Sequence, residues 1–384
     1  MRDYVEIGIG REARRTYDLA DISLVSNRRT RSSSDASTQW HIDAYTFDIP
    51  VVSHATDALA SPEFVIEMGK QGGLGVINAE GLWGRHEDLD GVIAEVCKSS
   101  DDLSVLQRLH AAPLKPELLA ERISQVRDSG VTVAVRVSPQ NAREIAPIVI
   151  AAGAELLFIQ GTLISAEHVS TGGEPLNLKE FIGTLEVPVI AGGVVDYTTA
   201  LHLMRTGAAG VIVGGGVNTN ADTVGIDVPL ATAIADVSAA RRDYLDETGG
   251  RYVHILADDD LNSSADMAKA IACGADAVVL GPLLAQAAEA GAGGFYWPAV
   301  AGHPRFPRGV VDYAGDPMFD LDGMEGNNKP SLETVLYGPS NEPFGQLNLV
   351  GGLRRAMAKC GYTDLKSFQK VGLEIGRASC RERV

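Results

Sequence analysis

Asp258 is the residue of this chain best suited, by type and position, to bind a small ligand. It follows YVHILA, an apolar run typical of a buried strand, so its carboxylate is expected at the carboxyl end of that strand. A carboxylate there can accept two hydrogen bonds from a ribose diol. It can equally cap the helix that follows, because aspartate is a favoured N-cap residue. Position alone leaves both interpretations open.

A second ligand contact is expected at Gly281, directly after the apolar run VVL. In barrels of alternating strands and helices, the loops after the last two strands often hold a phosphate on backbone N–H groups. Asp258 and Gly281 together predict a cradle for a nucleoside monophosphate. Two features oppose it: Asp259 and Asp260 add negative charge beside the phosphate, and Pro282 has no N–H to donate.

A glycine-rich loop lies in the stretch 206–236, which predicts a buried strand at 209–213, a loop that opens at Gly214 and a helix that continues from Pro229. The φ angle of proline suits the first turn of a helix. Without Cβ atoms, Gly214 and Gly216 let the backbone approach a ligand closely. Loops after the carboxyl ends of barrel strands are where sites are built.

Other polar side chains end apolar runs. His54 ends the first run, where both a structural hydrogen bond and a role in a site are possible. Gln160 ends the fourth run, and Thr162 lies just beyond it. Arg241 and Arg242 lie in a helical pattern rich in charge, which predicts solvated or interfacial side chains rather than catalytic ones.

Eight apolar runs predict the strands that position these residues. They lie at 51–54, 74–78, 131–137, 156–160, 188–191, 209–213, 252–257 and 277–280. Helical patterns lie between them, and several end on glycine, as a left-handed helix cap requires. This alternation predicts the α/β class and a (β/α)8 TIM barrel. A doubly wound open sheet is the alternative, which the lack of GxGxxG after the first strand disfavours.

The barrel is expected over residues 50–373, after an N-terminal entry segment at 1–49. Residues 291–343 are rich in Gly, Pro and aromatics, which predicts an irregular, lid-like segment within the barrel domain. Residues 374–384 read EIGRASCRERV, abandon the preceding pattern and back-translate onto a short-read sequencing adapter. We expect this tail to be an artefact of sequencing rather than part of the fold.

The composition opposes several classes of function. A net charge of −17 argues against nucleic acid as a partner, because no basic face offsets phosphate repulsion. No apolar run approaches the ~20 residues that span a bilayer, so no membrane partner is expected. Cys97, Cys273, Cys360 and Cys380 show neither metal spacing nor a disulfide framework, so no metal site is expected. A reduced, cytoplasmic protein is the expectation.

Stretches throughout the chain resemble the IMP dehydrogenase/GMP reductase family, above all its short actinobacterial paralogues. The similar pieces are DISLVSNRR, PVVSHATDALASPEF, GGLGVINAEG, AGGVVDYTTALHLMRTGAAGVIVG, VPLATAIAD, ADDDLNSSADMAKAIACGADAVVLG and LVGGLRRAMAKCGY. They are spread over nearly all of residues 15–373. The regulatory CBS-domain insertion of the family is not expected, because Asn78 and Val131 are too close in sequence to hold it. The resemblance also implies a homotetramer.

The resemblance implies oxidation or reduction at C2 of a purine nucleoside monophosphate, with NAD or NADP, in GMP metabolism. In the family, a cysteine in the loop after the sixth strand attacks the purine. Carried over by position, Asp258 is the carboxylate that binds the ribose, and Gly281 belongs to the phosphate loop. His54 and Thr56 fall where the family contacts the nucleotide.

The nucleophile loop departs from the family pattern, which is approximately GxGPGSxCTTR. This chain reads GGGVNTNADTV, so the loop from Gly214 to Thr223 contains no cysteine, and Ala221 takes the approximate place of the nucleophile. The catalytic residue is therefore unknown from the sequence. Gln160 and Thr162 are the candidates for contact with the cofactor.

Two functions remain open. One is a family oxidoreductase, including one altered in direction to reduce XMP or GMP. The other is a weak or inactive nucleotide-binding paralogue with a regulatory or subunit role, because loss of the thiolate removes covalent catalysis.

Overall fold

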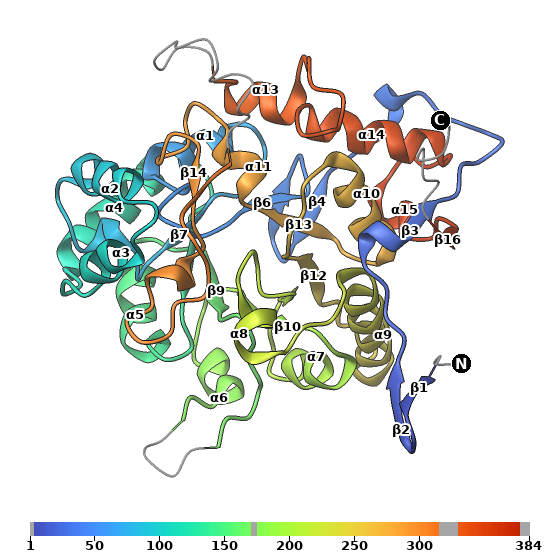
Figure 1. The fold of residues 1–384 in the computed structure, drawn as a ribbon, viewed down its shortest axis with the longest axis horizontal. Helices are drawn as coiled ribbons and strands as arrows, with labels where there is room; N and C mark the ends of the chain where they lie inside the picture. The colour runs from blue at the N-terminus through green and yellow to red at the C-terminus, as the bar shows by residue number, and fades with distance from the viewer. Residues whose placement is uncertain (1–3, 170–174, 315–328, 377–384) are drawn as a thin grey trace.

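Eight parallel strands form the centre of the molecule in the computed structural model, which describes residues 4–169, 175–314 and 329–376 (Figure 1). They are β6 (Val51–Ser53), β7 (Val76–Asn78), β8 (Ala134–Val137), β9 (Leu156–Gln160), β10 (Val189–Val194), β11 (Gly210–Val213), β12 (His254–Ala257) and β13 (Ala277–Leu280). Their order in the sheet is β6-β13-β12-β11-β10-β9-β8-β7. A parallel bridge between Val52 and Leu74 joins the two ends of the sheet. The predicted (β/α)8 barrel is confirmed.

The barrel strands are almost entirely buried, which explains why each reads as a continuous apolar run. Five of them, β7, β8, β10, β11 and β12, begin one to three residues later than the sequence predicts. β8 begins at Ala134, and β12 begins at His254, which is paired with Gly210 at the start of β11. The residues before Ala134 and His254 have side chains that suit a strand, but they precede the first residue that pairs with a neighbouring strand.

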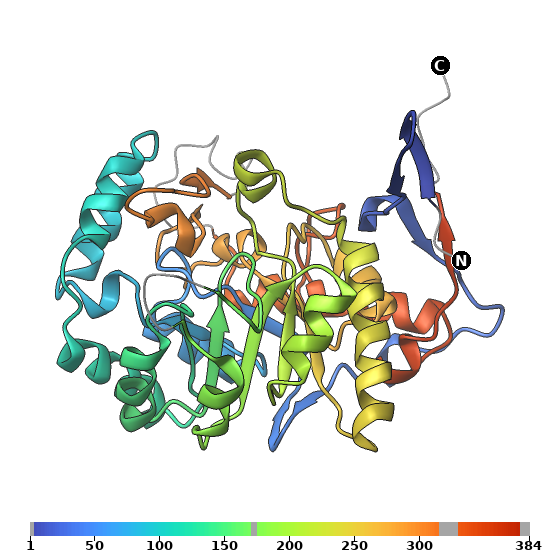
Figure 2. The ribbon, with the colours of Figure 1, turned by 90° about the horizontal axis from the view of Figure 1, so that it is seen from below.

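Apart from a short helix at residues 220–224, in the loop after β11, the helices cover the outside of the barrel (Figures 1 and 2). Up to the last barrel strand the helices are α1 (Pro62–Lys70), α2 (Leu89–Lys98), α3 (Leu103–His110), α4 (Pro116–Asp128), α5 (Ala142–Ala152), α6 (Leu178–Gly183), α7 (Tyr197–Met204), α8 (Asn220–Val224), α9 (Leu230–Thr248) and α10 (Ser264–Cys273). Residues 79–133, all of them described, hold the 3-10 turn η3 (Leu82–Gly84) and helices α2 to α4, and no CBS-domain insertion.

Local signals set the ends of these helices. Gly153 follows α5 with a φ of 117°, a conformation that glycine adopts without steric cost, as predicted for a left-handed cap. Pro229 is the residue before α9 rather than part of its first turn. The short helix α8, inside the glycine-rich loop, has no apolar periodicity, so the sequence does not predict it.

The entry segment 1–49 contains three pieces of sheet. β1 (Tyr4–Gly8) and β2 (Arg11–Arg14) form a hairpin that stands away from the barrel (Figures 1 and 2) and is anchored by an ion pair between Arg14 and Asp236 of α9. β4 (Trp40–Ile42) and β5 (Tyr45–Phe47) form a second hairpin. Its Ile42 side chain is buried beside Gly210, so this hairpin covers the amino end of the barrel.

The third piece, β3 (Ile22–Leu24), pairs with β16 (Leu373–Ile375). The first residues of the tail 374–384 therefore form backbone hydrogen bonds with β3, whereas residues 377–384, with Cys380, lie outside the described residues. The adapter origin of the tail stays a prediction.

Short elements follow β13 and cross the region predicted to be irregular. They are α11 (Pro282–Ala285), β14 (Phe295–Tyr296), η4 (Ala299–Gly302), β15 (Asp312–Tyr313), α13 (Leu332–Tyr337), α14 (Leu349–Lys359) and α15 (Leu365–Phe368). β14 pairs with β15, and α14 packs on α10 with Leu353 and Met357 buried. Within the segment 291–343, residues 315–328 lie outside the described part, and its lid-like role stays a prediction.

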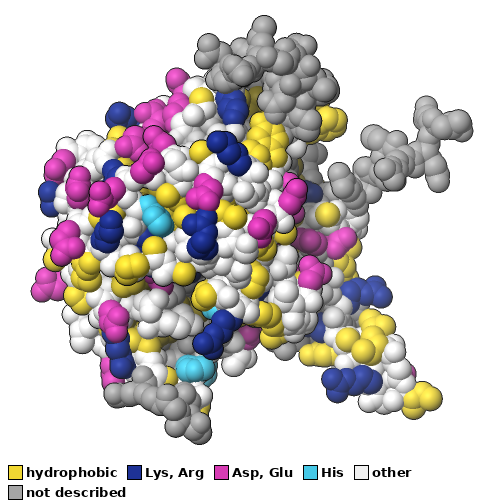
Figure 3. Space-filling view, turned by 60° about the vertical axis from the view of Figure 1, so that its left-hand side comes forward, with side chains coloured by type: hydrophobic (Ala, Val, Ile, Leu, Met, Phe, Trp, Pro, Cys, Tyr) yellow, Lys and Arg dark blue, Asp and Glu magenta, His cyan; other side chains and the backbone are white. Residues whose placement is uncertain are grey.

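The surface carries charges of both signs. Figure 3 shows Lys and Arg side chains interspersed with Asp and Glu over the face formed by α2 to α4. Among the described residues, no helix is both long and apolar enough to cross a membrane. In the same part of the chain, no three His, Cys, Asp or Glu side chains gather into a set that could hold a metal ion.

Arg241 is buried, and the expectation that it is solvated or interfacial is wrong. Its guanidinium donates to Asp276 Oδ2 at 2.7 Å and to the Gly274 carbonyl at 3.2 Å, and Asp276 is 3% exposed. Asp276 also accepts the backbone N–H of Ile255 in β12 at 2.9 Å. This ion pair ties α9 to two barrel strands at the amino end, opposite the ends where a site is expected.

Arg241→Ala should destabilise the fold by about 3 kcal/mol, because the buried Asp276 carboxylate loses its buried countercharge and keeps only the more exposed Lys366, 2.7 Å from its Oδ1. Urea denaturation measures the change. Arg242→Ala is the matched control, since Arg242 is exposed on the next position of the same helix, and it should change stability by less than about 0.5 kcal/mol. Equal effects of the two substitutions would mean that the pair does not hold the barrel together.

Candidate functional site

Asp258 lies at the mouth of the barrel, the edge where the carboxyl ends of the eight strands meet. Its backbone N–H donates to the Val213 carbonyl at 2.8 Å, which continues the ladder of β12 with β11 and fixes the carboxylate in place. The residue is 1% exposed. The N-cap of α10 is Ser263, whose hydroxyl accepts the Asp266 N–H. The helix-cap interpretation of Asp258 is therefore excluded.

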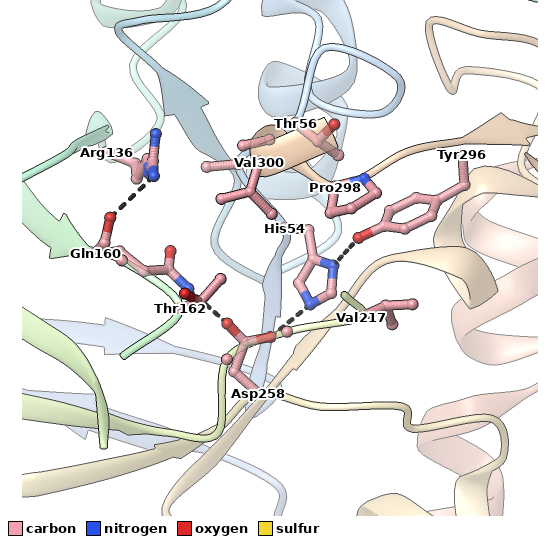
Figure 4. A pocket seen from close by; sticks show the side chains of 15 residues that line it. His54, Thr56, Arg136, Gln160, Thr162, Val217, Asp258, Tyr296, Pro298 and Val300 are labelled. Carbon is pink, nitrogen blue, oxygen red and sulfur yellow. Dashed lines mark hydrogen bonds and ion pairs between the residues drawn. The ribbon is translucent and has the colours of Figure 1, made fainter. Parts of the chain in front are cut away.

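Both carboxylate oxygens of Asp258 are hydrogen-bonded to side chains from other strands (Figure 4). His54 Nε2 lies 2.6 Å from Oδ1, and Gln160 Nε2 donates to Oδ2 at 2.6 Å. The other ring nitrogen of His54, Nδ1, lies 2.5 Å from the Tyr296 hydroxyl. A hydrogen-bonded chain Tyr296–His54–Asp258–Gln160 thus links β14, β6, β12 and β9.

Burial raises the pKa of Tyr296 well above its ordinary value, and the nearby Asp258 and Asp260 carboxylates add to the effect. The phenol therefore stays protonated and can donate to His54. In a neutral imidazole that donates from Nε2 to Asp258, Nδ1 is the acceptor that the phenol requires. These hydrogen-bonded side chains can hold a proton at the mouth of the barrel and transfer it between oxygen and nitrogen atoms.

A small cavity of about 50 Å³ lies above this chain. Its lining consists of His54, Ala55, Thr56, Arg136, Gln160, Gly161, Thr162, Gly215, Gly216, Val217, Asp258, Tyr296, Pro298, Ala299 and Val300. The structure thus brings together most of the residues that the sequence proposed for a site. Thr56 also donates its hydroxyl to the Trp297 carbonyl, which ties β6 to the segment after β14.

Two predicted contact residues lie behind the cavity wall, not in it. A Cβ on Gly281 would lie 2.2 Å from His54 Nδ1, so the His54 ring occupies the space beside that glycine. Gly214 has a φ of 98°, and a Cβ there would lie 2.1 Å from the Asp258 carbonyl. The first glycine makes room for a side chain, and the second lets two strand ends approach closely.

The loop after β11 presents no nucleophile to the cavity. Gly215, Gly216 and Val217 line it, and Asn218 closes the turn by donating to the Gly215 carbonyl at 2.9 Å and the Gly216 carbonyl at 2.6 Å. The turn is therefore held by its own backbone carbonyls.

The expectation of a loop from Gly214 to Thr223 is wrong at its far end, where residues 220–224 form the helix α8. Ala221 and Thr223 lie in this helix, exposed and outside the cavity lining. The Thr223 hydroxyl donates to the Thr219 carbonyl at 2.8 Å, one turn back, which supports the helix and keeps the side chain on its surface. Neither residue is placed to attack a ligand at the mouth of the barrel.

The cysteines within the described residues are also remote from the cavity. Cys97 lies in α2, Cys273 at the end of α10 and Cys360 directly after α14, and none lines the cavity. Burial raises the pKa of Cys273 to about 12, so its thiolate is scarce at neutral pH.

A large cavity of about 450 Å³ adjoins the small one above the ends of β7, β8 and β9. Gln160 and Thr162, proposed as cofactor contacts, line both cavities. Arg308 donates to the Thr162 hydroxyl at 2.8 Å. A volume of this size falls within the roughly 300–1,000 Å³ of ordinary ligand pockets, whereas the small cavity is well below it.

Sequence reasoning missed Tyr296, Arg136 and Arg308. Arg136 had a usable signal, since it is a lone charge inside the apolar strand VAVRV, and a charge there must find partners. It donates to Asn78 Oδ1 at 3.1 Å and to the Gln160 carbonyl at 2.9 Å. Tyr296 and Arg308 come from the segment after β13, where no periodicity shows which side chains face inward.

The amino-acid sequence is similar to those of known proteins with this architecture. Residues 15–300 match the family model described as "IMP dehydrogenase / GMP reductase domain". An "uncharacterized oxidoreductase" of Mycolicibacterium smegmatis is 62% identical over 97% of this chain and all of its own length. The inosine-5'-monophosphate dehydrogenase of Cryptosporidium parvum is 25% identical over 94% of this chain and 92% of its own.

Among solved structures, the crystal structure of an IMP dehydrogenase/GMP reductase-like protein from Corynebacterium glutamicum superposes with a TM-score of 0.91. It is 68% identical, and the match covers 97% of this chain and 98% of that one.

Asp259, beside the site, carries an unusual carboxyl group. Burial raises its pKa to about 7, and the carboxylates of Asp227, Asp258 and Asp18 raise it as well. The folded state therefore binds this proton more tightly than the unfolded chain, where the pKa of aspartate is about 3.9. The sign follows from linkage: between about pH 4 and pH 7, rising pH removes stability, and the full penalty is present above pH 7.

Asp259→Asn should therefore raise the melting temperature at pH 8, and the gain should shrink as the pH falls to 5 and then 4. On the order of 2 kcal/mol is expected at pH 8, about half of the full linkage value because the side chain is partly exposed. Calorimetric melting at the three pH values measures it. Asp260→Asn, on the exposed neighbour, should show no such trend, and a flat Asp259→Asn profile would mean that Asp259 is already ionised at pH 5.

Proposed function

Because the chain belongs to the IMP dehydrogenase/GMP reductase family of oxidoreductases, we propose that the mouth of its barrel binds a purine nucleoside monophosphate through Asp258. We further propose that it does so without the covalent step of a cysteine nucleophile. The observation that carries the proposal is the Asp258 carboxylate itself. It is buried at the mouth, takes no part in a helix cap, and accepts hydrogen bonds on both oxygens.

A ribose diol has the chemistry to replace the present partners of Asp258. His54 and Gln160 each offer one donor, at 2.6 Å, and the two hydroxyls of a ribose offer the same number. Exchange keeps both buried oxygens satisfied, which avoids the cost of an unpaired carboxylate. His54 and Thr56 line the same cavity and supply further polar contacts to the nucleotide.

The nucleotide needs more room than the small cavity offers. At about 50 Å³ that cavity is far below the roughly 300 Å³ of the smallest ordinary ligand pockets, because the His54 and Tyr296 side chains fill it. Binding therefore requires the His54–Asp258 and Gln160–Asp258 hydrogen bonds to open. Affinity is reduced by the fraction of molecules in which they are closed.

The cofactor implied by the family is NAD or NADP, and the residues present fit a nicotinamide dinucleotide. The large cavity has a suitable volume, adjoins the small one and offers polar side chains at Gln160 and Thr162. These residues would hold the cofactor, and Arg308 fixes the Thr162 hydroxyl. When bound, the cofactor supplies hydride transfer.

Among the described residues, no cysteine is placed to form the covalent bond to C2 of the purine. Cys97, Cys273 and Cys360 lie outside the cavity, and Asn218 holds the loop closed on itself. Without a nucleophile, family chemistry loses several powers of ten in rate. The function supported best is therefore that of a nucleotide-binding paralogue with a regulatory or subunit role. In line with the family, we expect a cytoplasmic homotetramer that acts in purine metabolism.

One observation favours a second candidate, a family oxidoreductase altered in direction that reduces XMP or GMP. The Tyr296–His54–Asp258 chain can deliver a proton at the mouth of the barrel, as a reduction requires. Within the described part of the protein no cysteine lines the cavity to form the covalent adduct, so this candidate ranks second.

Asp258→Asn should weaken binding of IMP, XMP and GMP by about tenfold or more, because the ribose loses a charged acceptor. Titration calorimetry of the chain without residues 377–384 measures it. Asp260→Asn, next in sequence but exposed, is the control and should bind as the wild type does. Equal affinity of wild type and Asp258→Asn would remove this carboxylate from the nucleotide site, and absence of binding by all three nucleotides would contradict the proposal as a whole.

The wild-type protein should form no NADH from IMP and NAD⁺ above background, before or after thiol alkylation. The reason is local, since none of the described cysteines, Cys97, Cys273 and Cys360, lines the cavity. Absorbance at the NADH band follows the reaction. Robust turnover that alkylation abolishes would overturn the assignment and require a rearranged loop that brings a cysteine to the mouth. Robust turnover that survives alkylation would favour the second candidate.

A further inference from the structure

The large cavity has a charge balance opposite to that of the chain. Its floor is the carboxyl ends of β7, β8 and β9, and residues 299–308 form the opposite wall. Arg85, Arg136 and Arg308 line it with a single carboxylate, Glu80, so three positive and one negative group give +2, against −17 for the whole chain. A positive cavity with low-dielectric walls concentrates its field on the ligand it encloses.

Glu80 and the buried carboxylate of Asp57, which does not line the cavity, compensate part of the charge of Arg85 and Arg136. Glu80 Oε2 lies 3.7 Å from Arg136 Nη1, and the Glu80 oxygens also accept from the Ser138 N–H, the Ser138 hydroxyl and the Asn141 amide. Arg136 is further bound to Asn78 and to the Gln160 carbonyl. Glu80 and Arg136 therefore satisfy each other and fix the cavity floor.

Arg85 and Arg308 differ in their surroundings within the described part of the chain. Burial lowers the pKa of Arg85, while Asp57 and Glu80 oppose that shift, whereas burial alone lowers the pKa of Arg308 and no carboxylate opposes it. Arg85 is anchored by its Nε to the Glu80 carbonyl at 3.2 Å and by Nη1 to the Ala112 carbonyl. Arg308 donates one hydrogen bond to the Thr162 hydroxyl, and its Nε is buried without a partner in the described chain. A half-buried guanidinium with an unused donor is costly unless an anion completes it.

His303 adds a neutral donor to the same wall. Its Nδ1 accepts the backbone N–H groups of Phe306 at 2.9 Å and Arg305 at 3.3 Å, so the hydrogen of the neutral ring is on Nε2. Burial lowers the pKa of His303, and Arg308 lowers it further, so the ring stays neutral at pH 7. A neutral N–H donor beside two guanidinium groups suits an acceptor with several oxygens.

We propose that the large cavity binds a phosphate monoester, held by the guanidinium groups of Arg308 and Arg85. Guanidinium groups match phosphate oxygens with paired donors, which favours this anion over a carboxylate of smaller charge. The phosphate has two possible sources. One is a nicotinamide dinucleotide that carries a 2′-phosphate, which rests on the proposed function. The other is a small phosphorylated metabolite, which does not.

The continuity of the two cavities favours the dinucleotide. Gln160, Gly161 and Thr162 form a shared wall, so a long ligand can lie across both with its phosphate at Arg308. On this basis the protein should bind NADP⁺ at least about tenfold more tightly than NAD⁺, because the extra phosphate gains charged hydrogen bonds.

Titration calorimetry with NADP⁺, NAD⁺ and inorganic phosphate, each added alone to the whole chain, tests the proposal. Arg308→Gln should reduce NADP⁺ affinity by about tenfold and bring it close to that of NAD⁺. Arg308→Lys, which keeps the charge but not the paired donors, should lose less. Arg305→Gln is the matched control, since Arg305 is exposed three residues away and does not line the cavity. Circular dichroism of each variant checks folding.

Each outcome has a defined meaning. An NADP⁺ preference that Arg308→Gln abolishes supports the dinucleotide as the source. Phosphate binding that needs Arg308, without preference for NADP⁺, supports the site with a small metabolite as its ligand. Absence of binding by NADP⁺ and phosphate, or equal loss in Arg308→Gln and Arg305→Gln, overturns the proposal. Failure of the nucleotide site is a separate result, because it appears as unchanged IMP, XMP and GMP affinity in Asp258→Asn.

Discussion

The mouth of the barrel is organised by one constraint: the buried carboxylate of Asp258 needs a hydrogen bond on each oxygen. A carboxylate that is 1% exposed is far too costly to leave unpaired, so the fold brings His54 and Gln160 to it from strands distant in sequence. Those two residues also contact other side chains at the mouth of the barrel. His54 holds the Tyr296 hydroxyl, and Gln160 presents its carbonyl to Arg136, which in turn is tied to Asn78 and Glu80.

The amino end of the barrel also contains a buried carboxylate, Asp276, but its partners differ from those of Asp258. Asp276 is matched by two cations, Arg241 and Lys366, besides a backbone N–H of β12, the Tyr252 hydroxyl and the Gln369 amide. A full countercharge makes that end rigid and leaves nothing for a ligand to replace. At Asp258 the partners are an imidazole and an amide, which a ligand can displace and which can turn away. Both carboxylates are buried. What distinguishes the structural Asp276 from the proposed ligand-binding Asp258 is therefore the charge of the groups that bind them.

The sequence predicts the barrel well because its strands are buried on both faces and read as apolar runs between glycine-capped helices. It also predicts Asp258, His54, Gln160 and Thr162 as site residues, since they end or follow such runs, whereas Thr56 is predicted only through the family resemblance. The rest depends on contacts between distant residues. No local pattern shows that Tyr296 reaches His54, that the His54 ring fills the space beside Gly281, or that Arg241 is buried against Asp276. The helix that holds Ala221 and Thr223 lacks apolar periodicity, since both side chains are exposed and pack on little.

The space beside Gly281 also makes three positions depend on one another. A Cβ at position 281 would lie 2.2 Å from His54 Nδ1 and 2.7 Å from Tyr296 Cε2. Any larger residue there would push both rings away, and with them the contact between the phenol and the imidazole. A barrel that keeps His54 and Tyr296 in this arrangement must therefore also keep glycine at 281, although that residue contributes no functional group of its own.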